Sequence, residues 1–330
     1  MSAHENASWK GRWPAPPNTL PPLRRSVLYS YDTGGTAALA VPYASAYQQT
    51  EADCILFEIE DSVPAADKDR VRTHLLEVLS QRNFAPGQRL MVTVNRFDSP
   101  WGRDDLLALA TAPGVTGVVL AKCEAASEVR AAAELLDSAG APPALEIWAM
   151  IESPRGLLAV SEIAKARPDR LAAINVGLGD LSRGLNSFRK PAPNRWPVVP
   201  ALASVVMAAR AEGLAVIDSS YRDDKSDSEV FAAACDSSRE LGFDGKVFDN
   251  PALVGVVNRS YSPTEADFDW SRRVFEAKAE APPNGLYYID GAHCDSAYEA
   301  LADRIRSFGR ALAARGDSQH VRGRGAPAKL

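Results

Sequence analysis

The sequence contains few cysteines and histidines, and neither residue type is spaced as in a metal site. There are four of each among 330 residues. Cys54, Cys123, Cys235 and Cys294 show no CxxC spacing, and the first three lie in or near apolar segments. We therefore expect small buried side chains in a reducing cytoplasm, without a zinc site or a disulfide framework. No histidine pairs with a recognisable nucleophile.

The chain also lacks a long apolar run, a signal peptide and a basic face. Its longest apolar runs fall far short of a membrane span, and residues 1–22 lack the apolar core of a signal peptide. The 37 basic and 42 acidic residues are interspersed, with a net charge of −5, which argues against a nucleic-acid-binding protein. These absences favour a cytoplasmic protein with small-molecule ligands.

Two glycine-rich stretches do not match nucleotide-binding motifs. Residues 32–36, DTGGT, lack the GK[ST] of a P-loop. Residues 177–180, GLGD, lack the third glycine of a dinucleotide fingerprint, and Asp180 would repel a pyrophosphate. We predict a loop in each case.

What the chain does contain is a pair of apolar runs that each end at a carboxylate. Residues 147–151 lead directly to Glu152, and residues 171–176 lead to Asp180, with helical spacing between the runs. This strand–helix–strand unit predicts parallel neighbours whose carboxylates emerge at the same edge. Two such ligands suit Mg²⁺. From this stretch alone, a helix cap at Glu152 and a turn at Asp180 are equally compatible.

The same alternation of strands and helices continues along most of the chain. Eight strands with buried faces favour a closed (β/α)₈ barrel over an open sheet. The predicted strands begin near Ser26, Cys54, Leu90, Val115, Ile147, Leu171, Ala215 and Lys246.

The ends of the chain differ from this pattern. Thr264 and Asp267 resemble a capped helix start, and an apolar stripe from Tyr298 to Leu312 must pack on the barrel or on a neighbouring subunit. The expected organisation is a flexible arm at 1–22, a catalytic barrel at 23–261, a helical segment at 262–315 and a disordered tail at 316–330.

Polar residues also follow other predicted strands. Glu58, Glu60 and Asp61 follow the second strand, Asp98, Asp104 and Asp105 follow the third, and Lys122 ends the fourth. A lysine there could bind an anionic substrate or form a Schiff base. We favour a salt bridge from Lys122 to Glu60 or Glu152 over covalent catalysis.

Six motifs, taken in order, carry a resemblance to a known family. Together they resemble the citrate lyase β-subunit-like group of the HpcH/HpaI aldolase superfamily, which includes malyl-CoA lyases, from about residue 25 to residue 308. The motifs are RRSVLY (24–29), EIEDSVPAADKDRVR (58–72), VNRFDSPWGRDDL (94–106), MIESPRGL (150–157), GLGDL (177–181) and LGFDGK (241–246).

The resemblance implies a TIM barrel with a C-terminal helical lid, assembled as a homotrimer or homohexamer. It implies Mg²⁺ held by Glu152 and Asp180, and Asp290 as an acid/base that the lid delivers into a neighbouring subunit's site. We expect burial on lid closure to raise the pKa of Asp290. The implied activity is carbon–carbon cleavage of a 2-hydroxy acid or hydroxyacyl-CoA through an enolate. Malate-synthase-like condensation, thioester hydrolysis and metabolite binding without turnover are the alternatives.

Departures from the family pattern affect substrate recognition. Thr93 stands where the family has an arginine that clamps a carboxylate, and Asn250 stands where it has a histidine. Basic residues that meet CoA phosphates are missing near Thr33 and Leu39. The substrate-binding set is predicted to be Arg25, Tyr29, Glu60, Asp61, Thr93, Arg96, Lys122, Asn250 and Pro251.

Arg96 is the candidate substitute for the missing clamp. It lies just past the third strand, where a long guanidinium group can reach over the barrel mouth. An ion pair with Asp98, Asp104 or Asp105 is the slightly favoured alternative.

Overall fold

The computed structural model describes residues 21–30, 50–81, 84–167, 169–187, 198–219, 228–281 and 287–317. The helix expected at 37–49 and the DTGGT stretch lie outside these residues. So do residues 33 and 39.

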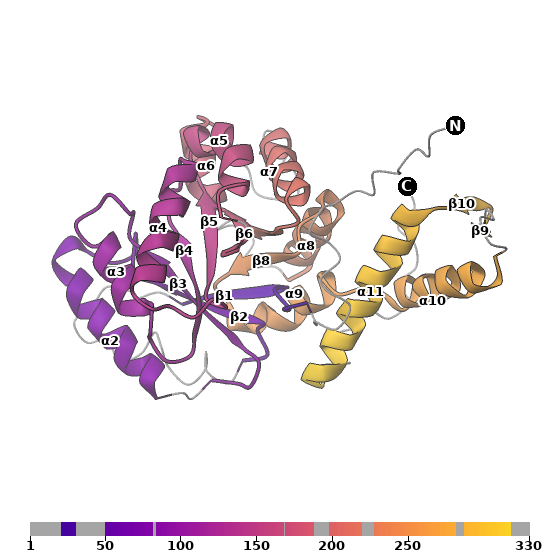
Figure 1. The fold of residues 1–330 in the computed structure, drawn as a ribbon, viewed down its shortest axis with the longest axis horizontal. Coiled ribbons are helices and arrows are strands. Elements are labelled where there is room, and N and C mark those ends of the chain that lie inside the picture. Colours follow the sequence, from indigo (N-terminus) through magenta and orange to yellow (C-terminus); the bar gives the residue numbers. More distant parts are fainter. Residues whose placement is uncertain are drawn as a thin grey trace, which may run out of the picture. The chain divides into compact units, whose positions relative to one another are not determined.

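Eight parallel strands form a closed barrel in sequence order (Figure 1), which confirms the predicted fold class. The barrel closes where the first and last strands pair, for example Val27 with Val247. The strands are β1 (Ser26–Ser30), β2 (Cys54–Glu58), β3 (Arg89–Val94), β4 (Val115–Leu120), β5 (Glu146–Ile151), β6 (Leu171–Val176), β7 (Ala215–Ser219) and β8 (Gly245–Phe248).

Helices follow the strands and surround the barrel (Figure 1). Within the described residues they are α2 (Lys68–Ser80), α3 (Gly102–Leu109), α4 (Ala126–Ser138), α5 (Pro154–Ala164), α6 (Leu178–Gly184), α7 (Val199–Ala211), α8 (Ser228–Leu241) and α9 (Val254–Ser260), with 3₁₀ turns η2 (Ala65–Asp67) and η5 (Pro251–Leu253).

Strand alternation separates two apolar cores. Outward-facing residues such as Leu28 and Phe57 are fully buried beneath the helices. Because both faces are covered, the strands read as continuous apolar runs. The barrel interior is filled by Val27, Cys54, Leu56, Met91, Val119, Trp148, Met150, Ala173, Ile217 and Val247.

The amino end of the barrel is closed by a charged cluster, which we call the barrel floor. Glu146 accepts ion pairs from Arg24 and Arg89, each at 2.7 Å. The indole nitrogen of Trp148 donates to the same carboxylate at 3.0 Å. Burial opposes ionisation of Glu146, but Arg24 and Arg89 hold its pKa below the usual range.

The predicted loop at GLGD is wrong, because these residues begin helix α6. Leu178 and Leu181 are both fully buried, so one helical turn packs two apolar side chains where a loop would expose them. The backbone nitrogen of Leu178 donates to Ser219 Oγ at 3.0 Å, which ties this turn to β7.

A second compact unit, distinct from Arg24–Tyr261, comprises the described residues 21–23, 262–281 and 287–317. It contains α10 (Glu265–Glu280), α11 (Ser296–Arg315) and a two-stranded antiparallel hairpin of β9 (Tyr287–Ile289) and β10 (Ala292–Cys294). The predicted start of α10 is confirmed as a capping box: Thr264 Oγ1 accepts from Asp267 N at 3.0 Å, and Asp267 Oδ2 accepts from Thr264 N at 2.7 Å.

The apolar stripe on α11 packs largely within this second unit. Tyr298 lies against Trp270 of α10, with ring centroids 6.0 Å apart. Phe308 and Leu312 pack on Leu23. Leu301, between them, remains 50% exposed.

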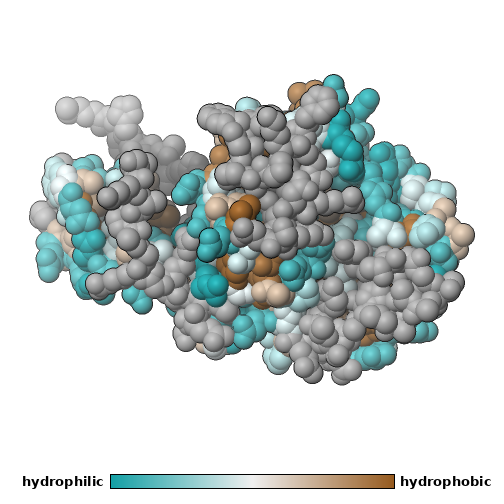
Figure 2. Space-filling view, turned by 180° about the vertical axis from the view of Figure 1, so that it is seen from behind, coloured by the Kyte–Doolittle hydropathy of each residue, from teal (hydrophilic) through white to brown (hydrophobic). Residues whose placement is uncertain are grey.

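Exposed apolar residues are spread over several elements of the described chain. None of the described helices is long and apolar enough to cross a bilayer. In Figure 2 the coloured part of this face is mainly hydrophilic, with apolar residues confined to small areas. The large exposed ones are Leu107, Leu158, Leu185, Met207, Tyr288 and Leu301.

Candidate functional site

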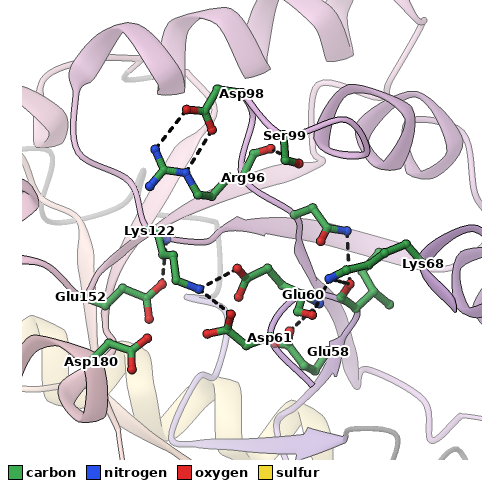
Figure 3. Close-up of polar contacts among 12 residues, drawn as sticks. Glu58, Glu60, Asp61, Lys68, Arg96, Asp98, Ser99, Lys122, Glu152 and Asp180 are labelled. Carbon is green, nitrogen blue, oxygen red and sulfur yellow. Dashed lines mark hydrogen bonds and ion pairs between the residues drawn. The ribbon is translucent and has the colours of Figure 1, made fainter. Parts of the chain in front are cut away.

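The carboxylates of Glu152 and Asp180 lie together at the carboxyl end of the barrel. Strands β5 and β6 are parallel neighbours, as predicted, with Ile151 paired to Val176. Glu152 follows β5 directly, and Asp180 lies in the first turn of α6. Figure 3 shows both side chains directed into the same space beside Lys122.

A glycine permits this close approach. A Cβ atom on Gly177, at the end of β6, would lie 2.5 Å from both Cβ and Oε2 of Glu152. No larger residue fits there unless Glu152 moves. The glycine of GLGD therefore makes room for the carboxylate rather than for a phosphate.

Glu152 is a buried carboxylate whose charge is only partly compensated. Its Oε1 accepts a 2.7 Å hydrogen bond from the backbone nitrogen of Lys122. It is 8% exposed, and burial raises its pKa to about 7 despite Lys122. The alternative that Glu152 caps the next helix is wrong, because Ser153 Oγ accepts from Gly156 N at the start of α5.

Lys122 connects Glu152 to the acidic residues after β2. Its Nζ donates to Glu60 Oε1 at 2.6 Å and pairs with Asp61 Oδ1 at 2.7 Å. Burial opposes its charge, but Asp61 and Glu60 raise the pKa of Lys122 above its usual value. A protonated amine is a poor nucleophile, so the ion pair favoured from the sequence is confirmed with Glu60.

The backbone of Lys122 adopts the left-handed conformation, with φ of 51°. Residues other than glycine rarely adopt it, and such strain concentrates at functional sites. Here it lets one residue direct its amide towards Glu152 and its side chain towards Glu60.

Glu58 is a buried acid that the sequence-based site list omitted. It is 1% exposed at the end of β2, on the same face as interior Leu56. Tyr29 donates its hydroxyl hydrogen to Glu58 Oε2, and the backbone nitrogen of Glu60 donates to Oε1. Burial raises the pKa of Glu58 to about 7 and also raises that of Tyr29. Strand alternation in FEIED was the signal that could have identified it.

We expect Glu58→Gln to flatten the pH dependence of stability in the metal-free protein. A carboxyl group with a raised folded-state pKa contributes stability that is fully present below its unfolded pKa of 4.5 and is lost as pH rises through about 7. Urea unfolding at pH 5 and pH 8 measures how far the free energy of unfolding falls between these two pH values. This fall should be smaller in the variant than in the natural chain, by up to roughly 3 kcal/mol. Glu162→Gln, on the exposed face of α5, is the control; an equal change in both variants would contradict the assignment.

The residues after β2 and β3 are held by a polar network. Lys68 Nζ donates to the carbonyl oxygens of Ile59 and Glu60 at 3.2 and 2.5 Å. Asn95 Nδ2 donates to the Ile59 carbonyl at 3.1 Å and to Asp105 Oδ2 at 2.6 Å. Asp105, predicted only as part of the acidic group after the third strand, is buried. Its hydrogen bond from Asn95 orients these loops.

Thr93 and Arg96 occupy different environments. Thr93 is 1% exposed on β3, next to Glu58 of β2, and its Oγ1 has no hydrogen-bond partner in the part of the chain described. Arg96 is bound by Asp98, with Nε–Oδ1 and Nη2–Oδ2 distances of 3.0 and 3.1 Å (Figure 3). The ion pair favoured from the sequence is confirmed with Asp98.

Arg25 lies away from these residues, which corrects its place in the substrate-binding set. It precedes β1, at the amino end of the barrel, and is fully buried. Its Nε and Nη2 donate to Asp53 at 2.9 Å each. Arg25 therefore has a structural role. Asn250 and Pro251 do follow β8 at the carboxyl end, where the Asn250 side chain accepts from Ala252 N at 3.0 Å.

Asp290 lies at the tip of the hairpin in the second unit. Asp290 and Gly291 have φ values of 49° and 79°, as in a two-residue hairpin turn. The sequence-based description missed this hairpin, although Asp-Gly between apolar runs is its usual signal. Asp290 is exposed, and Arg273 lowers its pKa. The raised pKa expected on lid closure is thus not a property of the isolated chain.

The residues present fit Mg²⁺ better than a transition metal. Among the described residues, no group of three or more His, Cys, Asp and Glu is placed to hold a metal ion. Mg²⁺ typically takes one or two carboxylates and fills its other positions with water and substrate. Glu152 meets this requirement because its raised pKa marks a negative charge that a cation would stabilise. Asp180, whose ion pair within the described residues is with exposed Arg183, can supply the second ligand.

Comparison with known proteins identifies relatives over most of the chain. Residues 37–251 match the model of the HpcH/HpaI aldolase/citrate lyase family. A (3S)-malyl-CoA thioesterase of Cereibacter sphaeroides is 34% identical over 298 residues, which cover 89% of this chain and 97% of that protein. The citrate lyase β subunit of Escherichia coli is 32% identical over 268 residues, covering 80% and 85%.

Solved structures share the fold. CitE from Mycobacterium tuberculosis, in complex with magnesium, acetoacetate and coenzyme A, has a TM-score of 0.64 and 25% identity, covering 86% of this chain and 97% of that one. A citrate lyase from Burkholderia xenovorans has a TM-score of 0.74 over 92% and 96% of the two chains; at 16% identity it supports the fold alone.

Proposed function

The chain belongs to the HpcH/HpaI aldolase/citrate lyase family, and on that premise we propose that it is a Mg²⁺-dependent carbon–carbon lyase. The substrate class is a 2-hydroxy acid, carried as a hydroxyacyl-CoA, in the cytoplasm. The observation that carries the proposal is the pair of carboxylates, Glu152 and Asp180, on neighbouring strand ends, one of them buried with a raised pKa.

Each residue of the site has a separate role in the proposal. Glu152 and Asp180 hold Mg²⁺, which when bound supplies Lewis-acid polarisation of the substrate's hydroxy or oxo oxygen. Lys122 orients Glu152 through its amide and neutralises Glu60. In cleavage, Asp290 of a second copy takes the proton of the substrate's hydroxyl group as the hydroxyl carbon becomes a carbonyl and the carbon–carbon bond breaks. The electron pair of that bond stays on the carbon next to the thioester carbonyl, to which Asp290 then delivers the proton.

The test is 2-oxo-acid release from a panel of hydroxyacyl-CoAs, including malyl-CoA and citramalyl-CoA, with and without EDTA. We expect stoichiometric 2-oxo acid and acyl-CoA, and loss of turnover in EDTA that added Mg²⁺ restores. Turnover that is insensitive to EDTA would refute the metal-dependent mechanism.

Thioester hydrolysis is the second candidate, favoured by the name of the Cereibacter sphaeroides relative. Hydrolysis releases free CoA and leaves the hydroxy acid intact, whereas cleavage releases acyl-CoA. A thiol reagent combined with 2-oxo-acid detection therefore separates the two reactions.

Metabolite binding without turnover is the candidate from another class. A binding protein has little requirement for a competent Mg²⁺ site. Calorimetry with MgCl₂ should show binding that is lost in Glu152→Ala; no binding by the natural chain would favour this alternative.

We also propose that the active form is a homotrimer or homohexamer, because Asp290 acts in a neighbouring copy. Leu301, exposed on α11, is available for such contacts. Light scattering that shows a monomer at micromolar concentration would contradict a shared site.

Arg96 and Thr93 provide a prediction about the substrate's carboxylate. If Arg96 leaves Asp98 to bind an anionic substrate, Arg96→Ala should raise KM by a factor equivalent to about 1.5–3 kcal/mol, with little change in stability. Steady-state kinetics on the best acidic substrate measures this. If Arg96→Ala leaves KM unchanged while Thr93→Arg improves activity on a 2-oxo acid, the natural substrate lacks that carboxylate.

A further inference from the structure

The contact between Arg273 and Asp290 has no role in the proposal so far. Arg273 Nη1 donates to Asp290 Oδ1 at 2.7 Å, and Nη2 donates to Oδ2 at 3.0 Å. Two parallel bonds fix the direction of a carboxylate as well as its position. The guanidinium comes from helix α10, whereas Asp290 lies on the hairpin tip.

The surroundings of Asp290 make Arg273 its main charged neighbour. On α10, Arg273 Nε also lies 3.2 Å from Asp269 Oδ2, one turn earlier, which restricts the arginine. On the hairpin, the titratable rings are those of Tyr288 and His293, 5.7 Å apart. Arg273 is the neighbour that lowers the pKa of Asp290.

The pair has little to contribute to stability. The side chains of Arg273 and Asp290 are 37% and 64% exposed, and solvent screens the attraction of an exposed ion pair. What two bonds to an exposed tip can do is restrict the rotamers of the carboxylate and keep it ionised. Both effects matter for a group that must enter another site with a defined direction.

We propose that Arg273 is a positioning residue that presents Asp290 as an oriented carboxylate in its proton-accepting form. This inference rests on the proposed function, in which Asp290 exchanges a proton with substrate carbon. The group starts as a base, which takes a proton from the carbon next to the thioester carbonyl of an acyl-CoA. In the cleavage direction the same carboxylate first takes the proton of the substrate's hydroxyl group, and after the carbon–carbon bond breaks its conjugate acid delivers that proton to the carbon next to the thioester carbonyl.

The experiment compares Arg273→Gln with Arg272→Gln in the full chain. Arg272 is the matched control, because it lies next to Arg273 on α10 and pairs with Asp269 and Glu276 instead of Asp290. Two readouts are needed: the pH profile of kcat for malyl-CoA cleavage, and hydrogen–deuterium exchange at the methyl group of acetyl-CoA in D₂O. KM is measured alongside.

Loss of Arg273 should raise the pKa of Asp290 and allow the Asp290 side chain to adopt more than one rotamer. In Arg273→Gln, the limb of the pH profile that depends on Asp290 should move to higher pH, because the cation that lowers the pKa of Asp290 is gone. Maximal kcat should fall roughly tenfold through lost orientation, with KM unchanged. In Arg273→Lys, the limb of the pH profile should stay close to its position in the natural chain, because the positive charge is kept. The kcat should remain as low as in Arg273→Gln. Arg272→Gln should match the natural chain.

A double variant tests whether Arg273 acts through Asp290. Arg273→Gln combined with Asp290→Asn should be no slower than Asp290→Asn alone. Suppose the natural chain is active and Arg273→Gln has the same pH profile and the same kcat as the natural chain. That result would overturn the role of Arg273 while leaving the lyase proposal intact. A natural chain without turnover or exchange would overturn both.

Discussion

Replacing Glu152 with glutamine is expected to lower kcat/KM by at least about a thousandfold, or roughly 4 kcal/mol of transition-state stabilisation. Glutamine retains the shape and the oxygen that accepts from Lys122 N, so the fold is kept. It removes the negative charge that we propose binds Mg²⁺. A second consequence is that MgCl₂ should raise the melting temperature of the natural chain but not that of Glu152→Gln.

Asp180→Asn should show the same two losses, because it removes the other proposed ligand. Glu162→Gln is the control: this carboxylate lies on the helix that follows Glu152 and pairs only with Lys165 at 3.1 Å among the contacts described. Full EDTA-sensitive activity in Glu152→Gln would mean that the metal binds elsewhere.

Replacing Lys246 with methionine is expected to lower the free energy of unfolding by about 3–5 kcal/mol. Lys246 and Asp218 are both fully buried, with Nζ 2.8 Å from Oδ2. Lys246 also donates to the Ser219 carbonyl at 3.2 Å and lies over the Phe231 ring. Methionine fills the space but removes the cation that pairs with Oδ2 of the buried Asp218 carboxylate. Urea unfolding followed by circular dichroism measures the change.

The double variant Lys246→Met/Asp218→Leu should recover much of the loss, since it removes both buried charges. Lys165→Met, at an exposed pair, should change stability by less than about 0.5 kcal/mol. A single variant as stable as the natural chain would show that Asp218 finds another partner or a proton.

The barrel could be predicted because its strands carry their signal locally. Covered on both faces, segments such as residues 147–151 and 171–176 are apolar throughout, and parallel pairing then brings Glu152 and Asp180 to one edge. The start of α10 was equally local, since Thr264 and Asp267 form their capping box within one helical turn.

What the sequence could not supply was the partner of each charged side chain. Arg25 belongs to a motif but is satisfied by Asp53, 28 residues away. Glu58 and Glu60 are two residues apart and would share a face of an extended strand, so alternation alone does not separate the fully buried acid from the residue that meets Lys122. Such pairings depend on tertiary geometry, which hydrophobic periodicity does not encode.

Two local elements were missed for a different reason. The hairpin at Asp290 and the turn that begins α6 are too short to show a period. In the first, turn chemistry carried the signal, since Asp-Gly adopts positive φ at both positions. In the second, the glycines of GLGD suggested a loop, whereas Gly177 is needed for the close contact with Glu152.

The barrel floor restricts where substrates and products can reach the barrel. Glu146, held between Arg24 and Arg89, and the fully buried indole of Trp148 occupy the amino end of the barrel. In the proposed site, a molecule at Glu152 is therefore expected to enter and leave at the carboxyl end. When the proposed cleavage yields two products there, we expect the oxo acid near the carboxylates to leave after the bulkier acyl-CoA and to compete with the next substrate.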